Sequence, residues 1–253
     1  MRATSDQYGR AVVAWQIGLL DRLPPEIAHA VVARAEDELG WAILMRDVGP
    51  DLIPPGDDPI GVRENTYFLA AMAALHVTFW EDPGAADLRL GFCHLRHRYA
   101  ELSPETGRCE TGGPDSVPRL ILEGWDLLRM MVELDVAGIL SELLEDPRPL
   151  CEALDRHPQT VVHGDWKLGN LGLLRGRQPR VILLDWAVMG PAPPGVDLAW
   201  YLAVNSARLP VPKEAAIACY RPELERRLGN RFDEQWWQPQ LELSLLVGFL
   251  QLG

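Results

Sequence analysis

The sequence of 253 residues predicts an α+β fold in which a small mixed segment precedes a larger, mainly helical one. Three observations lead to this fold class. Two strand-like runs occur before residue 46, helical periodicity dominates after residue 61, and short apolar runs recur between residues 160 and 184. Hydrophobic residues make up 47% of the chain and charged residues 24%, which is typical of a globular protein and excludes a disordered one.

The N-terminal segment is predicted to form one helix and two strands. Residues 8–22 carry apolar side chains at helical spacing and stop before the breaker Pro24-Pro25. Residues 28–34 and 41–45 have the apolar, β-branched character of strands, and the AEDELG stretch between them is typical of a hairpin turn.

A linker separates this segment from the rest of the chain. Residues 49–61 are rich in Pro, Gly and Asp, so we divide the chain into residues 1–48 and residues 49–253. A helix is expected next, because apolar residues recur at spacings of four, three and four at Phe68, Met72, Leu75 and Phe79.

Further helices are predicted on both sides of a short strand region. We expect a loop at 101–116, a long helix bent near Gly138 at 117–145, and a shorter helix at 147–156. Helices are also expected from Pro194 to the end. Between these helices, three short strands are expected at residues 160–162, 171–174 and 181–184, the last two joined as a hairpin.

Polar and reactive residues gather at the ends of these strands. His163, Asp165, Lys167 and Asn170 lie within eight residues, and Asp185 follows the last strand. Because a hairpin brings its two ends together, two carboxylates and an amide should meet at one edge. Their oxygens suit Mg²⁺, a further carboxylate can accept a proton from a hydroxyl, and a lysine can neutralise a phosphoryl group. This set indicates phosphoryl transfer.

The spacing His163-x-Asp165-x-x-x-x-Asn170 resembles the protein-kinase catalytic loop, with Gly164 in place of its arginine. Together, HGDWKLGN and LLDW resemble the aminoglycoside phosphotransferase and choline kinase group of small-molecule kinases. Residues 41–49 resemble its hinge strand, residues 73–80 its first C-lobe helix, and residues 193–200 its later Asp motif. The resemblance covers nearly the whole chain and implies a protein-kinase-like, two-lobe fold.

The resemblance implies a role for each site residue. Asp165 would be the catalytic base, with Lys167 near the γ-phosphate and His163 bracing the loop. Asn170 and Asp185 would bind Mg²⁺. Backbone groups near Arg46 and Val48 would contact the adenine of ATP, and Asp197 would anchor the backbone of the catalytic loop. The expected activity is ATP- and Mg²⁺-dependent phosphorylation of a hydroxyl on a small molecule.

The nucleotide half of this pattern is incomplete. Of the 24 basic residues only Lys167 and Lys213 are lysines, so the family's strand lysine is absent, as is its glycine-rich loop. Residues 8–22 also lack the glutamate that would pair with that lysine. We therefore expect a truncated N-lobe and a C-lobe cut short, in a chain that is a piece of a longer protein. A degenerate, shortened family member is the alternative.

Other function classes stay open. The missing lysine would suit a pseudokinase-like binding protein, and a choline- or sugar-kinase-like enzyme shares the motif. A helical domain with a coincidental motif is the third alternative. The acceptor and the oligomeric state do not follow from the sequence.

The composition of the chain and its terminal and apolar segments restrict the partners it could bind and the compartment it could occupy. The net charge of −12 argues against a nucleic-acid surface. The four cysteines are scattered, residues 1–6 lack the apolar core of a signal peptide, and no apolar run reaches about 20 residues. These features indicate a cytoplasmic protein without a membrane span.

Overall fold

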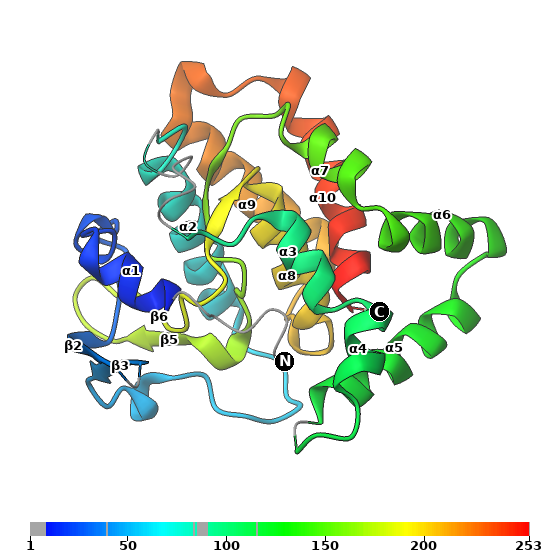
Figure 1. Cartoon of the computed structure of the whole chain (residues 1–253). Coiled ribbons are helices and arrows are strands. Elements are labelled where there is room, and N and C mark those ends of the chain that lie inside the picture. Colours follow the sequence, from blue (N-terminus) through cyan, green and yellow to red (C-terminus); the bar gives the residue numbers. More distant parts are fainter. Residues whose placement is uncertain (1–8, 39, 83, 85–90, 115, 253) are drawn as a thin grey trace.

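The computed structural model describes residues 9–38, 40–82, 84, 91–114 and 116–252 (Figure 1). Residues 1–6, which bear on the signal peptide, and Leu39 of the predicted hairpin turn lie outside the described residues. The mixed α+β fold expected from the sequence is confirmed, and the described residues form helices around three small sheets.

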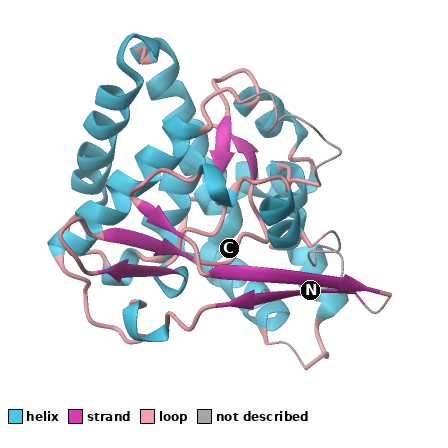
Figure 2. Cartoon of the chain, turned by 90° about the vertical axis from the view of Figure 1, so that its left-hand side faces the viewer, coloured by secondary structure: helices cyan, strands magenta, loops and turns pink. Residues whose placement is uncertain are grey.

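The N-terminal segment begins with α1 (Arg10–Gln16), which is shorter than the predicted helix. Gly18 has a left-handed backbone (φ 69°), and this conformation cannot continue an α-helix. The predicted hairpin is confirmed: β2 (Val31–Asp37) pairs antiparallel with β3 (Gly40–Met45), and Asp37 lies opposite Gly40. Figure 2 shows this hairpin as the longest pair of strands.

A three-stranded sheet joins the N-terminal segment to the strand region around the candidate site. β1 (Ile27–Ala28) pairs parallel with β6 (Arg180–Leu183), and β6 pairs antiparallel with β5 (Leu171–Leu174), so the predicted β5–β6 hairpin is confirmed. The N-terminal segment is thus attached through β1 to the strand that leads to Asp185.

The third sheet contains a strand that the sequence did not predict. β4 (Thr160–Val162) pairs antiparallel with β7 (Gly190–Ala192). β7 reads Gly-Pro-Ala and lacks the β-branched and aromatic residues that favour strands, so only its partner β4 reveals it. This pairing fixes both ends of the segment that contains the candidate site.

Helices form most of the remaining chain. In chain order they are α2 (Val62–Thr78), α3 (Leu95–Glu101), α4 (Pro104–Glu110), α5 (Val117–Met131), α6 (Leu134–Glu145), α7 (Arg148–Leu154), α8 (Gly195–Val204), α9 (Lys213–Leu228) and α10 (Glu234–Leu252). α2 packs against α9, and α8 packs against α10 (Figure 1). No helix within the described ranges is long and apolar enough to cross a lipid bilayer.

Two of the predictions for this region were wrong. The expected loop at 101–116 contains α4, because Ser103 caps it by accepting a hydrogen bond from the Thr106 N–H (3.2 Å) and Pro104 is tolerated in the first turn. The expected bend near Gly138 lies earlier, where Val132 and Glu133 are extended between α5 and α6. Gly138 stays helical, since one glycine costs a helix only about 1 kcal/mol.

The main core lies around α2 and beneath the strand ends. α2 is buried on most of its surface, including Phe68, Met72 and Leu75. Trp166 and Trp186, which flank the predicted site, are also fully buried in this core. The core therefore holds the loops after β4 and β6 on a rigid base.

Candidate active site

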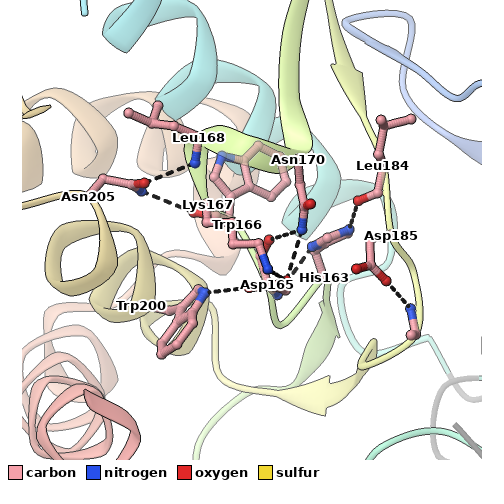
Figure 3. Close-up of polar contacts among 11 residues, drawn as sticks. His163, Asp165, Trp166, Lys167, Leu168, Asn170, Leu184, Asp185, Trp200 and Asn205 are labelled. Carbon is pink, nitrogen blue, oxygen red and sulfur yellow. Dashed lines mark hydrogen bonds and ion pairs between the residues drawn. The ribbon is translucent and has the colours of Figure 1, made fainter. Parts of the chain in front are cut away.

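The structure brings the loop after β4 close to the end of β6. His163, Gly164 and Asp165 follow β4 directly, and a 3₁₀ turn (Leu168–Asn170) leads into β5. Asp185 lies two residues beyond β6. Figure 3 shows these side chains converging from the two strand ends.

Asp165 is held by donors on both of its carboxylate oxygens. Oδ1 accepts a hydrogen bond from the Trp200 indole N–H (3.0 Å), and Oδ2 accepts one from the Asn170 side-chain amide (2.9 Å). Lys167 Nζ lies 2.6 Å from the same Oδ2. The residue is 9% exposed, so its carboxylate is largely desolvated and has a defined orientation. These are the properties of a preorganised proton acceptor.

The side chain of Lys167 is more exposed to solvent than that of Asp165, its ion-pair partner. Its side chain is 41% exposed, so the ion pair with Asp165 is partly screened by water and contributes little to stability. A solvated ammonium can turn from Asp165 to an incoming anion, and the Trp200 and Asn170 donors then still hold the carboxylate.

His163 links the loop to the strand before Asp185. Its Nε2 donates to the Leu184 carbonyl (2.9 Å), and its Nδ1 accepts from the Asp165 backbone N–H (3.2 Å), which assigns the neutral Nε2–H tautomer. Burial lowers the pKa of His163, consistent with the neutral ring. The ring meets Trp166 and Trp186 edge to face and is completely buried. It has no surface for a substrate and acts as a brace.

Asp197 accepts two hydrogen bonds from the backbone of the same loop. Its Oδ2 accepts from the His163 N–H (2.8 Å) and its Oδ1 from the Gly164 N–H (2.7 Å). His76, whose other ring nitrogen lies 2.6 Å from the Tyr220 hydroxyl, contacts Oδ2 at 3.2 Å. Burial by itself raises the pKa of Asp197, but the His76 hydrogen bond and the backbone donors outweigh it and hold the pKa below its usual value. The fully buried carboxylate is therefore charged.

Gly164 explains why this loop lacks the arginine of the protein-kinase pattern. Its backbone is left-handed (φ 82°), and a Cβ atom there would lie 2.5 Å from the Val188 carbonyl oxygen and 2.8 Å from a guanidinium nitrogen of Arg98. Any larger residue would have to displace the loop after Asp185.

Asn170 and Asp185 present oxygen atoms suited to a divalent cation. Within the described residues, the side-chain hydrogen bonds of Asn170 use its nitrogen, on Asp165 Oδ2 and on the Asp165 carbonyl (3.0 Å). Asp185 is exposed, and its one hydrogen bond to described residues is a long one from the Ala187 N–H (3.4 Å). Its backbone is left-handed (φ 64°), a conformation that is uncommon for a non-glycine residue and that turns the chain sharply after β6. An amide oxygen and an open carboxylate fit Mg²⁺.

Arg46 and Val48 lie beyond β3, above an apolar cluster. The Arg46 N–H donates to the Ala30 carbonyl (2.8 Å), and the Val48 carbonyl accepts from the Asp51 N–H (2.9 Å). Within the described residues, neither the Arg46 carbonyl nor the Val48 N–H has a backbone hydrogen-bond partner. The Val48 side chain is buried with Ala30 and Ile182, and Leu52, Leu174 and Leu184 pack against them.

Two residues of the site were missed by sequence reasoning, and both come from α8 or its end. Trp200 donates to Asp165, and Asn205 accepts from the Leu168 N–H (2.9 Å) and donates to the Trp166 carbonyl (3.3 Å). Both lie at least 30 residues from the loop that they contact, so no local spacing marks them.

These features define a class of protein. A buried carboxylate beside a lysine, with an amide and an open carboxylate at the next strand end, is the residue set of kinase-type phosphoryl transfer. The sequence model of the phosphotransferase enzyme family matches residues 68–229, and the chain belongs to this family. No curated protein sequence matches the chain significantly.

Solved structures share the fold at low sequence identity. An aminoglycoside phosphotransferase from Streptomyces rimosus, solved with ADP and streptomycin, is 18% identical with a TM-score of 0.56, covering 96% of this chain and 81% of that one. An ethanolamine kinase from Plasmodium vivax is 12% identical with a TM-score of 0.58, covering 98% and 66%. A putative aminoglycoside phosphotransferase from Ralstonia eutropha is 18% identical with a TM-score of 0.50, covering 97% and 73%. The predicted kinase-like fold and family are confirmed.

Proposed function

We propose that this protein transfers the γ-phosphoryl group of ATP to a hydroxyl group of a small molecule. The observation that carries the proposal is the orientation of Asp165, whose two oxygens are held by Trp200, Asn170 and Lys167. A carboxylate oriented in this way can receive a proton at a defined point.

The proposed reaction is an in-line displacement. The acceptor hydroxyl oxygen forms a bond to the γ-phosphorus while the bond from that phosphorus to the β,γ-bridging oxygen breaks, and ADP leaves with the electron pair. Asp165 accepts the hydroxyl proton. Lys167 can release Asp165 and follow the charge of the transferring group, because its ammonium is already partly in water.

The remaining residues hold the reactants and the loop. Asn170 and Asp185 would hold Mg²⁺, which when bound neutralises phosphate charge. The backbone groups of Arg46 and Val48 would contact the adenine base. Asp197 would keep the loop backbone in place, and His163 would tie it to the strand before Asp185. The choice of ATP is supported by the ADP bound in the similar Streptomyces rimosus structure.

Turnover of ATP tests the proposal. We would measure ADP release with Mg²⁺ and a panel of aminoglycosides and amino alcohols, on this chain and on the longest in-frame product of its gene. Asp165→Ala should lower acceptor-dependent turnover by roughly 10²–10⁴-fold, the usual contribution of a general base. Asp126→Asn, at an exposed carboxylate on α5, is the matched control and should retain activity. If Asp165→Ala turned over at the wild-type rate, Asp165 would not be the base.

A binding protein without catalysis is the second candidate. It is favoured by one observation, that no lysine precedes residue 167 to hold the nucleotide phosphates. A thermal-shift titration with ATP and Mg²⁺ separates the two. A folded protein whose Tm does not change with ATP and Mg²⁺ would support the binding protein. A saturable rise in Tm that Asp185→Asn abolishes would support the enzyme.

A further inference from the structure

Arg98, on α3, is a buried cation that has no ion-pair partner among the described residues. It is only 5% exposed, and its Nε is fully buried without a hydrogen-bond partner. Within the described residues, its guanidinium makes neither a hydrogen bond nor an ion pair. It lies over the face of Trp200, whose ring centre is 5.1 Å from Cζ, in a cation–π contact.

Burying such a charge without a bound ligand costs folding free energy. Arginine stays protonated at any accessible pH, so it cannot escape burial by losing its charge. An aromatic face offsets part of the lost hydration, but a buried charge is normally paired as well. An anion from outside the chain would supply the missing partner, and a guanidinium binds carboxylates and phosphates through two parallel hydrogen bonds.

The position of Arg98 relates it to the acceptor rather than to the nucleotide. Trp200, which Arg98 covers, donates to Oδ1 of Asp165, whereas Asn170 and Lys167 contact Oδ2. Figure 3 shows Trp200 and Asn170 on opposite sides of Asp165, with Asp185 on the side of Asn170. Within the described residues, Arg98 contacts Trp200, the donor to Oδ1, and makes no hydrogen bond or ion pair with the proposed metal ligands. It also lies against Gly164, next to Asp165 in the chain.

We propose that Arg98 binds an acidic group of the acceptor, so that the small molecule phosphorylated by this protein is a hydroxy acid rather than a purely cationic amino alcohol or aminoglycoside. This inference rests on the proposed function for its catalytic part. Its binding part stands on the unpaired guanidinium alone.

Kinetics with matched acceptors test the catalytic part. Glycerate, 4-hydroxybutyrate and gluconate would each be compared with the corresponding uncharged amide. The acids should have a KM at least about tenfold lower than their amides, and Arg98→Gln should remove this preference, as expected when one charge-assisted hydrogen bond is lost. The KM for ATP should change less than about twofold, since the contact is to the acceptor. Arg96→Gln, at an exposed arginine two residues earlier, should behave as the wild type.

Arg98→Gln could instead change the KM for ATP equally with acid and with amide acceptors. That result would show that Arg98 binds a nucleotide phosphate and would overturn the inference. Equal KM values for acids and amides in the wild type would also overturn it.

Thermal shifts test the binding part without turnover. Malonate and inorganic phosphate, at constant ionic strength set with chloride, should raise the Tm of the wild type and of Arg96→Gln but not that of Arg98→Gln. Without anions, Arg98→Met should melt at or above the wild-type temperature, because it removes an unpaired buried charge. A marked fall in its Tm, or no anion-dependent shift in the wild type, would show that Arg98 only supports the fold. ATP turnover with uncharged acceptors would then leave the proposed function intact.

Discussion

Replacing Asp197 with asparagine should destabilise the protein more than any other isosteric change at the site. The carboxylate is completely buried and accepts from two backbone N–H groups at 2.7 and 2.8 Å, with His76 as a third contact. An asparagine keeps one oxygen for one of these donors. Its NH₂ group must face the other N–H, where donor meets donor.

The magnitude follows from these contacts. Losing one charge-assisted hydrogen bond costs about 1.5–3 kcal/mol, and leaving one buried N–H unpaired costs about 1–3 kcal/mol. We expect a loss of about 3–5 kcal/mol in the free energy of unfolding. For a protein of this size, each kcal/mol lowers the Tm by about 2–4 °C, so the Tm should fall by roughly 6–20 °C.

Urea unfolding of Asp197→Asn and the wild type, followed by tryptophan fluorescence, measures this difference. The control is Asp126→Asn, whose exposed carboxylate pairs with Arg129 and should change the stability by less than about 1 kcal/mol. Because the pKa of Asp197 is held below its usual value, its contribution is complete above about pH 4 and is lost as the pH falls through the lowered pKa. The two curves should therefore converge in acid. A difference below about 1 kcal/mol at pH 7 would refute the role of Asp197 as the anchor of the loop.

Three further predictions concern the same loops. Gly164→Ala should cost about 2–4 kcal/mol in urea unfolding, from its left-handed backbone and the contact with Val188; a loss below about 1 kcal/mol would contradict that geometry. Asp185→Asn should leave the Tm within about 2 °C yet lower Mg²⁺-dependent turnover at least about 100-fold, and equal turnover would exclude Asp185 as a metal ligand. Stability should decline by about 1.4 kcal/mol per pH unit as the pH falls below about 6.5, because the pKa of His163 is lowered in the folded protein and the unfolded chain therefore binds this proton first. His163→Gln should flatten this dependence of the unfolding free energy on pH. An unchanged slope would argue against the buried neutral ring.

Local sequence patterns predicted the strands and most helices because those elements depend on neighbouring residues. The apolar runs around β4, β5 and β6 and the four-three-four spacing along α2 were sufficient for this. The same patterns failed at β7, which forms because β4 offers its edge. The start signal of α4 is local, Ser103 followed by Pro104, and it was read as part of a loop.

The candidate site divides in the same way. His163, Asp165, Lys167 and Asn170 lie in one short loop, so their spacing alone brought them together as a kinase-like set, and Asp185 followed from the hairpin. The sequence could not show how Asp165 is oriented, because Trp200 reaches it from a helix 35 residues away in the chain. The sequence also does not explain why a glycine stands at position 164, because the atom that a larger side chain would hit is the Val188 carbonyl oxygen, 24 residues away in the chain.

By itself, the sequence determined the chemistry that is available: a carboxylate, a lysine, an amide and a second carboxylate at two strand ends, with no lysine upstream. Only the tertiary structure decided which of these groups are buried, charged and oriented, because burial and hydrogen-bond partners are set by residues distant in the chain. Arg98 is the clearest case. In the sequence it is one of 22 arginines, and only the packing of α3 against Trp200 leaves it buried near the proposed base, with no ion-pair partner in the part of the chain that the structure describes.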